Sequence, residues 1–189
     1  MPLITIAPPG EEPVTVQEVK DAARIDDSAY DAQIPGIIRS LRRLVESNLG
    51  RRLVTQTVEL VLPSFPRDEI DLQLPNVQTI SSVKYLDPDG NQQTLATNRY
   101  LLLSDYSPSL LMPAMGSQWP ATANRPDAVR IRFDAGYGAP ADVPDEIKLW
   151  IKAHAVQAIN NPDGLSDGNL KPLPYVDGLL DYYKIWRAV

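Results

Sequence analysis

The sequence predicts an α+β fold, with a small helical bundle core and a β-rich insertion between the second and third main helices. Before residue 54 and after residue 143, apolar residues recur every three or four positions, which is the period of a helix. Between them, apolar and polar residues alternate, as in strands with one buried face. The 189 residues, 43% of them hydrophobic, fit one globular domain. We expect an N-terminal arm over 1–12, helices over 13–53, the β-rich insertion over 54–138, a helix over 139–161, and a loop with a C-terminal helix or arm over 162–189.

The first two helices carry clear boundary signals. Thr15 is the expected N-cap of a short helix ending near Arg24, and Glu18 completes a capping box. A second helix is expected from residue 27 or 28 to Gly50, where glycine favours the left-handed conformation of a helix end. Pro35 lies inside this pattern and predicts either a kink or a true start close to it.

The insertion contains a predicted hairpin. Asp87-Pro88-Asp89-Gly90 has the residue preferences of a type I turn, so the turn should join strands over 82–86 and 92–95. An Asp-x-Asp-Gly string also begins calcium loops. Asn98 stands where such a loop requires a bidentate glutamate, which disfavours calcium binding.

The region after the insertion predicts a strand, a glycine turn and a third helix. Val129, Ile131 and Phe133 alternate with arginines, and Pro144 marks the start of a helix over 144–160. His154, the single histidine, lies on the apolar side of this helix, where a hydrogen-bonded core residue is expected rather than a general base. The chain has no cysteine, phosphate-binding glycine loop, zinc-ligand spacing or nucleophile elbow. We therefore expect no enzyme activity, no catalytic residue, no cofactor and no metal.

Several sequence blocks, in order, resemble the head-tail connector (adaptor, or head-completion) proteins of long-tailed bacteriophages. They are VTVQEVKDAARID, LVESNLGRRL, PNVQTISSVKYLDPDG, RPDAVRIRFDAGYG with VPDEIKLWI, and LPYVDGLLDYYKIW. The resemblance covers nearly the whole chain. It implies a structural virion protein that forms a ring, joins the portal vertex of the head to the tail or neck, and extends the DNA exit channel. The implied partners are the portal protein, neighbouring copies in the ring and a downstream neck or tail component. The implied location is the head-tail junction of the virion, after assembly in the host cytoplasm.

The distribution of charge suggests a candidate interface between subunits. The net charge of −6 argues against affinity based on neutralising nucleic-acid phosphates, so packaged DNA should pass without sequence-specific binding. No apolar run is long enough for a membrane span, and we expect no membrane partner. Residues 36–56 are nevertheless basic, with five arginines and one glutamate. These arginines form either the oligomer interface or a solvated helix face: Arg39, Arg42, Arg43, Arg51 and Arg52.

The C-terminal segment supplies candidate partner-docking residues. A loop rich in glycine and aspartate precedes a helix predicted over 176–187. Leu179 and Leu180 favour the core, whereas Tyr182, Tyr183 and Trp186 fit either the core or a docking surface.

Two alternative functions remain open. One is another neck or tail-completion protein, which would dock elsewhere. The other is a β-rich surface or carbohydrate-binding module, suggested by the many short strands and by Trp119 and Tyr106.

Overall fold

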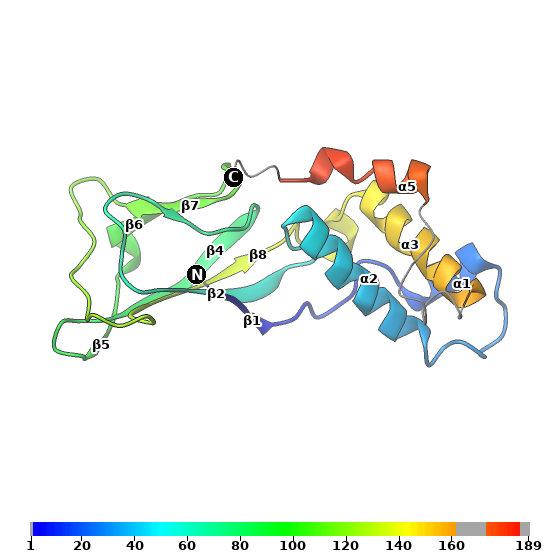
Figure 1. The fold of residues 1–189 in the computed structure, drawn as a ribbon, viewed down its shortest axis with the longest axis horizontal. Helices are drawn as coiled ribbons and strands as arrows, with labels where there is room; N and C mark the ends of the chain where they lie inside the picture. Colours follow the sequence, from blue (N-terminus) through cyan, green and yellow to red (C-terminus); the bar gives the residue numbers. More distant parts are fainter. Residues whose placement is uncertain (1, 162–172, 186–189) are drawn as a thin grey trace. The chain divides into compact units, whose positions relative to one another are not determined.

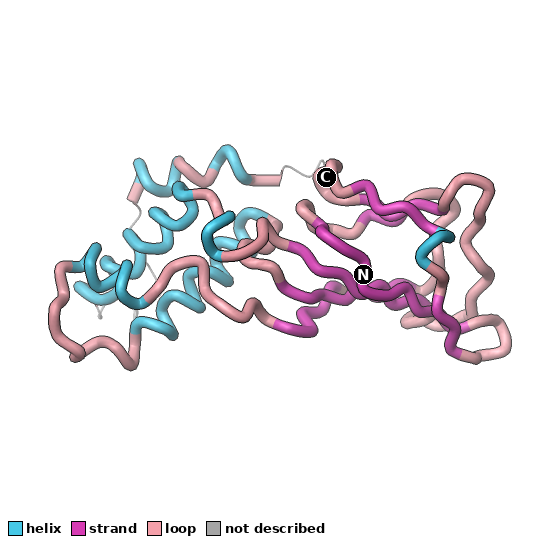
Figure 2. Tube along the Cα trace, turned by 180° about the vertical axis from the view of Figure 1, so that it is seen from behind, coloured by secondary structure: helices cyan, strands magenta, loops and turns pink. Residues whose placement is uncertain are grey.

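The computed structural model describes residues 2–161 and 173–185, which combine helices with two antiparallel sheets (Figures 1 and 2). The chain divides into two compact units. The first, called here the sheet unit, comprises Met1–Gly10 and Thr55–Tyr137. The second, called the helical unit, comprises Glu11–Val54 and Gly138–Val189. The sheet unit thus takes its residues from the start of the chain and from the region of alternating hydrophobicity.

The larger sheet has five strands in the order β1-β2-β8-β4-β5, and all neighbouring strands are antiparallel. The strands are β1 (Leu3–Ala7), β2 (Gln56–Leu62), β4 (Val77–Leu86), β5 (Gln92–Thr94) and β8 (Val129–Ala135). The expected N-terminal arm over 1–12 differs from the structure, because Leu3–Ala7 form strand β1 instead of a free arm. This strand pairs with the edge of β2 that does not pair with β8. The hairpin of β4 and β5 is confirmed, with Lys84 opposite Thr94 and Leu86 opposite Gln92.

The smaller sheet has three antiparallel strands in the order β3-β7-β6. They are β3 (Ile70–Asp71), β6 (Tyr100–Leu103), which follows the 3-10 turn η1 (Thr97–Arg99), and β7 (Leu110–Pro113). One core lies between the strands of this unit. Its fully buried side chains include Val58, Leu60, Leu111, Ile131 and Phe133.

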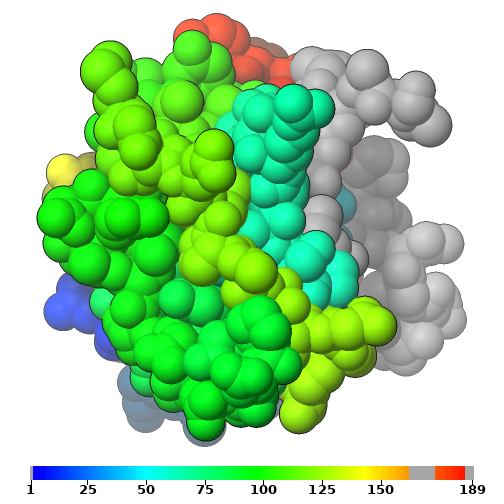
Figure 3. All heavy atoms as spheres, turned by 90° about the vertical axis from the view of Figure 1, so that its left-hand side faces the viewer, coloured from blue at the N-terminus to red at the C-terminus, as the bar shows by residue number. Residues whose placement is uncertain are grey.

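The alternation along β8 has a direct structural outcome. Val129, Ile131 and Phe133 are buried, while Arg130 and Arg132 lie on the other face and bind the carboxylate of Glu59. Figure 3 looks onto the end of this unit where β5, β6 and their loops lie. Elsewhere in the sheet unit, Trp119 stacks on Phe65 with ring centroids 4.9 Å apart, and its indole N–H donates to the carbonyl oxygen of Asp68 at 2.7 Å.

The start of α1 (Val16–Ala23) confirms the predicted capping box. The Glu18 backbone N–H donates to Thr15 Oγ1 at 3.1 Å, and the Thr15 N–H donates to Glu18 Oε2 at 2.7 Å. The hydrogen bond from the Thr15 backbone is the largest of the effects that lower the pKa of Glu18. The helix ends at Arg24, which adopts the left-handed conformation.

Helix α2 (Ile34–Leu49) begins later than residue 27 or 28, with Pro35 in its first turn. The helix therefore starts next to Pro35 and does not kink there. A proline in the first turn removes no helical hydrogen bond, because the backbone N–H groups of that turn have no partner within the helix. The helix ends at Gly50, whose φ of 66° confirms the predicted glycine stop.

Helix α3 (Asp145–Asn160) follows the 3-10 turn η2 (Pro140–Asp142), and Pro144 occupies its N-cap. Gly138 before this turn has a φ of 141°, and the Asp142 carboxylate lies where a Cβ would stand. Helix α3 packs against both α1 and α2. In the described parts of the chain, no helix has the length and apolar character needed to cross a bilayer.

The C-terminal helix expected over 176–187 is wrong in its extent. The segment forms two short pieces, α5 (Pro174–Gly178) and the 3-10 turn η3 (Asp181–Tyr183). Gly178, a poor helix former, ends the first piece. Leu180 between the two pieces is buried, as its apolar side chain predicted, and Leu179 is half-buried.

Candidate functional site

The five candidate interface arginines fall into two groups. Arg39 and Arg43 are exposed on α2, and neither is ion-paired within the described part of the chain. Arg42 is only 3% exposed, and Arg51 and Arg52 are half-buried. The interpretation of Arg42 as a surface residue is therefore wrong. It lies on the side of α2 that faces the interior of the helical unit.

Arg42 and Glu46 form the centre of a buried ion-pair cluster. Arg42 Nη1 lies 3.0 Å from Glu46 Oε2, one turn along α2, and Arg42 Nε lies 2.6 Å from Glu12 Oε2. Glu46 also lies 3.6 Å from Arg52 Nη1 and accepts the backbone N–H of Leu53 at 3.1 Å. The cluster therefore ties the segment before α1 and the segment after α2 to α2 itself. Its arginines are structural, because a buried charge requires a partner.

The sequence did not indicate that Glu46 is the partner of Arg42. In the sequence, Glu46 was only the one negative charge among the five arginines of residues 36–56. The spacing of Arg42 and Glu46 by four residues was the available signal, since such pairs meet on one helix face. Glu12 carried no local signal, because it lies 30 residues from Arg42.

The carboxylate of Asp177 fastens the C-terminal segment to α3. The indole N–H of Trp150 donates to Asp177 Oδ1 at 2.8 Å, and His154 Nε2 lies 2.9 Å from the same oxygen. The backbone N–H of Leu173 donates to Asp177 Oδ2 at 2.8 Å. Burial raises the pKa of Asp177, but the hydrogen bonds from His154, Leu173 and Trp150 outweigh it and hold the pKa below its usual range.

The expectation that His154 is a hydrogen-bonded core residue is confirmed. Its side chain is 4% exposed, and its ring centroid lies 4.1 Å from that of Trp150. The sequence did not indicate Asp177 as its partner, because the two residues are 23 positions apart.

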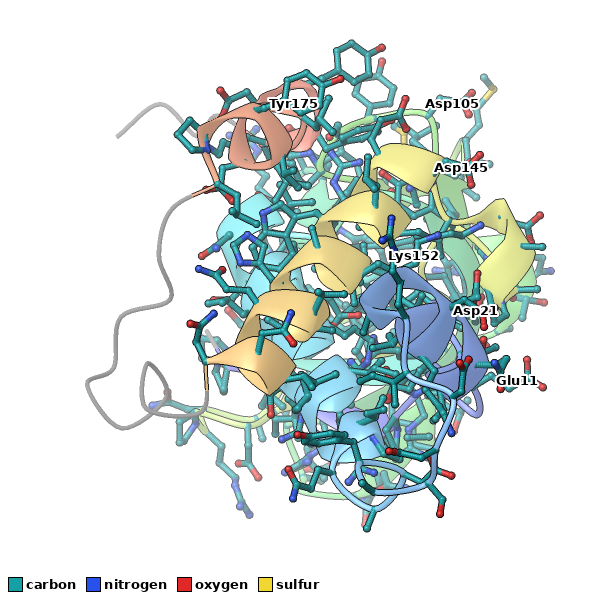
Figure 4. The ribbon with its side chains drawn as sticks, turned by 90° about the vertical axis from the view of Figure 1, so that its right-hand side faces the viewer. Glu11, Asp21, Asp105, Asp145, Lys152 and Tyr175 are labelled. Carbon is teal, nitrogen blue, oxygen red and sulfur yellow. The ribbon has the colours of Figure 1, made fainter. Side chains whose placement is uncertain are left out.

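The three candidate docking aromatics differ in their surroundings. Tyr182 is 89% exposed. Tyr183 is half-buried, and its hydroxyl donates to Glu146 Oε2 at 3.0 Å, while Arg51 lies 6.0 Å from its ring centroid. Trp186 lies outside the described residues. Among these three, Tyr182 is thus the residue whose ring is open to a partner within the described structure, and its docking role stays a prediction. Tyr175 on α5 is also exposed, at 78%, and is labelled in Figure 4.

Comparison with known proteins gives a match at the level of structure. No protein-family model matches the sequence, and no curated protein sequence matches it. A chain from the neck of an empty gene transfer agent (GTA) particle, computed with C6 symmetry, has a TM-score of 0.83 at 20% identity. A chain from the virion of the native GTA particle has a TM-score of 0.82 at 20% identity, and one from the native neck with C12 symmetry has 0.72 at 19%. Each match covers 100% of this chain and 98% of the other. At this identity, the similarity shows that these chains share a fold of mixed helices and antiparallel strands.

Proposed function

We propose that this chain is a ring-forming subunit in the neck of a phage-like particle. Its role is to join the portal vertex of the head to the tail or neck and to extend the DNA exit channel, as in head-tail connectors. The observation that carries the proposal is the fold similarity to GTA neck chains over the whole length of both chains. The neck of the empty GTA particle was computed with C6 symmetry and that of the native particle with C12 symmetry, which supports a ring of identical subunits.

The division into two units suggests how such a subunit is built. The helical unit would serve as the rigid bundle core, held by the Arg42–Glu46 cluster and the Asp177 anchor. The sheet unit, taken mostly from the middle of the chain, would be the insertion. In this arrangement, the function is assembly and no chemical step or cofactor is involved.

The partners follow from the same proposal. They are the portal protein, neighbouring copies of the chain, and a downstream neck or tail component at the head-tail junction of the virion, with assembly in the host cytoplasm. Packaged DNA would pass through the channel without specific binding, and the net charge of −6 disfavours adhesion to its phosphates.

Electron microscopy of the portal protein from the same genome, with and without this chain, tests the proposal. The expected result is an added ring of density below the portal, coaxial with its channel. Density elsewhere in the neck would favour the alternative of another neck or tail-completion protein. No binding to portal or tail particles would reject the neck assignment and reopen the alternative of a β-rich surface or carbohydrate-binding module.

A further inference from the structure

Helix α3 is apolar on two opposite sides. One side, which includes Ile147, Ile151 and Ala158, is buried within the helical unit. The other carries Leu149, Ala153 and Val156, spaced four and three residues apart, so their side chains form one stripe. Leu149 is 44% exposed, and the other two are partly exposed. A helix that is apolar on both sides is normally covered on both.

This second side of α3 forms a groove with α1. The groove has a volume of about 600 Å³ and is lined by Ala22, Leu149, Ala153 and Val156, with Glu18, Asp21 and Lys152 at its edges. Figure 4 shows Asp21 on α1 and Lys152 on α3 along this face. Lys152 and the nearby Lys148 offset the charge of Glu18, and the carboxylate of Asp21 adds a further negative charge. The pKa of Glu18 is lowered, with the backbone hydrogen bond of Thr15 as the largest cause, so this carboxylate stays ionised. The groove is therefore apolar at its floor and carries the Asp21 carboxylate at its rim.

The outer face of α2 has the complementary properties. Gly36, Ser40, Arg43 and Ser47 recur every three or four residues and are all exposed, so they form one ridge. The small residues on this ridge allow a close approach of another helix surface. Two further exposed residues flank the ridge, Arg39 on one side and Leu44, 42% exposed, on the other. Together with these flanking residues, the ridge presents two arginines and an apolar side chain.

The groove and the ridge face away from each other on the helical unit. Helix α2 packs against α3, and the residues that α2 turns inward, such as Ile38 and Val45, are buried. The ridge lies on the opposite side of α2, and the groove stripe lies on the side of α3 opposite its buried residues. One copy therefore cannot bring its own ridge and groove together, whereas two copies can, in a head-to-tail contact.

We propose that the α2 ridge of one copy docks into the α1–α3 groove of the next copy, with Arg43 facing Asp21 and Leu44 meeting the apolar floor. The occupant is a second copy because this face of α2 supplies an arginine for the Asp21 carboxylate and an exposed leucine for the apolar floor. This inference rests on the proposed ring function and names the surface that closes the ring. Repetition of one heterologous contact generates a ring when its rotation closes.

Disulfide cross-linking tests the contact directly, because the natural chain has no cysteine. Ser40→Cys marks the ridge and Ala153→Cys marks the groove. Mixing the two single variants under mild oxidation should give a cross-linked dimer with one copy of each variant. The ridge of the Ser40→Cys chain and the groove of the Ala153→Cys chain then each carry a thiol, whereas the reverse contact carries none. The doubly substituted chain should give a ladder of oligomers. The control is Ser64→Cys, exposed on the sheet unit, mixed with Ala153→Cys, and it should give no defined dimer.

A charge reversal gives a second, independent readout. Arg43→Glu in the cross-linking background should slow dimer formation by about tenfold or more, because it places like charges together. When the Ser40→Cys chain carries Arg43→Glu, adding Asp21→Lys to the Ala153→Cys chain should restore much of the rate. Arg67→Glu, the same charge change on the exposed surface of the sheet unit, should leave the rate unchanged.

The outcomes separate this contact from the neck assignment. Cross-linking of either single variant alone as fast as the mixture would indicate a symmetric or random contact and overturn the inference. Rings on the portal that fail to cross-link between positions 40 and 153 would also overturn it, while leaving the neck function intact. Cross-linked oligomers in solution without any ring on the portal would support the contact and reject the neck function.

Discussion

The side chains of Arg42 and Glu46 form an ion pair that is almost closed to solvent, with 3% and 2% of each side chain exposed. Arg43, the next residue, is exposed. Two adjacent arginines therefore have opposite roles, one in folding and one on the surface. Reversing the charge of Arg42 should therefore disturb folding, whereas reversing the charge of Arg43 should not.

Arg42→Met should lower the free energy of unfolding by about 3 kcal/mol, because it leaves the buried carboxylate of Glu46 without its nearest partner. Arg43→Met, the matched control, should change it by no more than about 0.5 kcal/mol. Urea unfolding of the two variants measures both values. Equal effects at the two positions would contradict the buried cluster.

The Asp177 anchor should weaken at acid pH. Hydrogen bonds lower the pKa of Asp177 in the folded chain, so its carboxylate stabilises the docked C-terminal segment at pH values above the ordinary aspartate pKa. This contribution is lost as the pH falls through the lowered value. The indole N–H resonance of Trp150, which donates to Asp177, should report the loss by NMR.

Two comparisons control the NMR titration. Asp177→Asn cannot ionise, so its Trp150 resonance should not follow a carboxyl titration. The indole of Trp119 donates to a backbone carbonyl and should also stay constant in the natural chain. A Trp150 resonance that ignores pH across the carboxyl range would count against the anchor.

Leu180→Ala should destabilise the helical unit by about 2 kcal/mol, since it removes a buried side chain that is 5% exposed. Truncation after Asn161 removes this side chain together with Asp177 and should cost more than the point variant. Thermal melting checks both. A fragment 1–161 as stable as the full chain would restore the interpretation of the whole segment as a tethered arm.

Tyr182→Ala should leave stability unchanged, because its ring is 89% exposed. If Tyr182 docks on a partner, the same variant should weaken binding to the portal by about tenfold. Leu101→Ala, an exposed apolar residue of the sheet unit, is a control for nonspecific effects. Unchanged portal affinity for Tyr182→Ala would remove this residue from the docking surface.

The isolated protein should be monomeric or weakly associated at micromolar concentration. The ridge of Gly36, Ser40, Arg43 and Ser47 adds only Leu44 as a large apolar side chain, so each contact between copies should bury little apolar surface and be weak without the portal. Analytical ultracentrifugation over a wide concentration range measures the association. A tight, large oligomer of the pure protein is the result that contradicts this expectation.

The sequence by itself determined several local features. The capping box of Thr15 and Glu18, the stop at Gly50 and the hairpin around Asp87–Gly90 each depend on residues within a few positions of one another. The alternation along β8 likewise fixed which of its side chains are buried. Such signals are readable because backbone geometry and nearest neighbours decide them.

Only the tertiary structure decided which charged and aromatic residues are available to a partner. Arg42 and Arg43 look alike in the sequence, but Glu12, which lies 30 residues before Arg42, pairs with Arg42 and not with its neighbour Arg43 in the described structure. The pairing of Leu3–Ala7 with β2 and of Asp177 with Trp150 and His154 also joins distant segments. The physical reason is that burial and ion pairing depend on how elements pack in space, and that packing brings together residues which no local pattern relates.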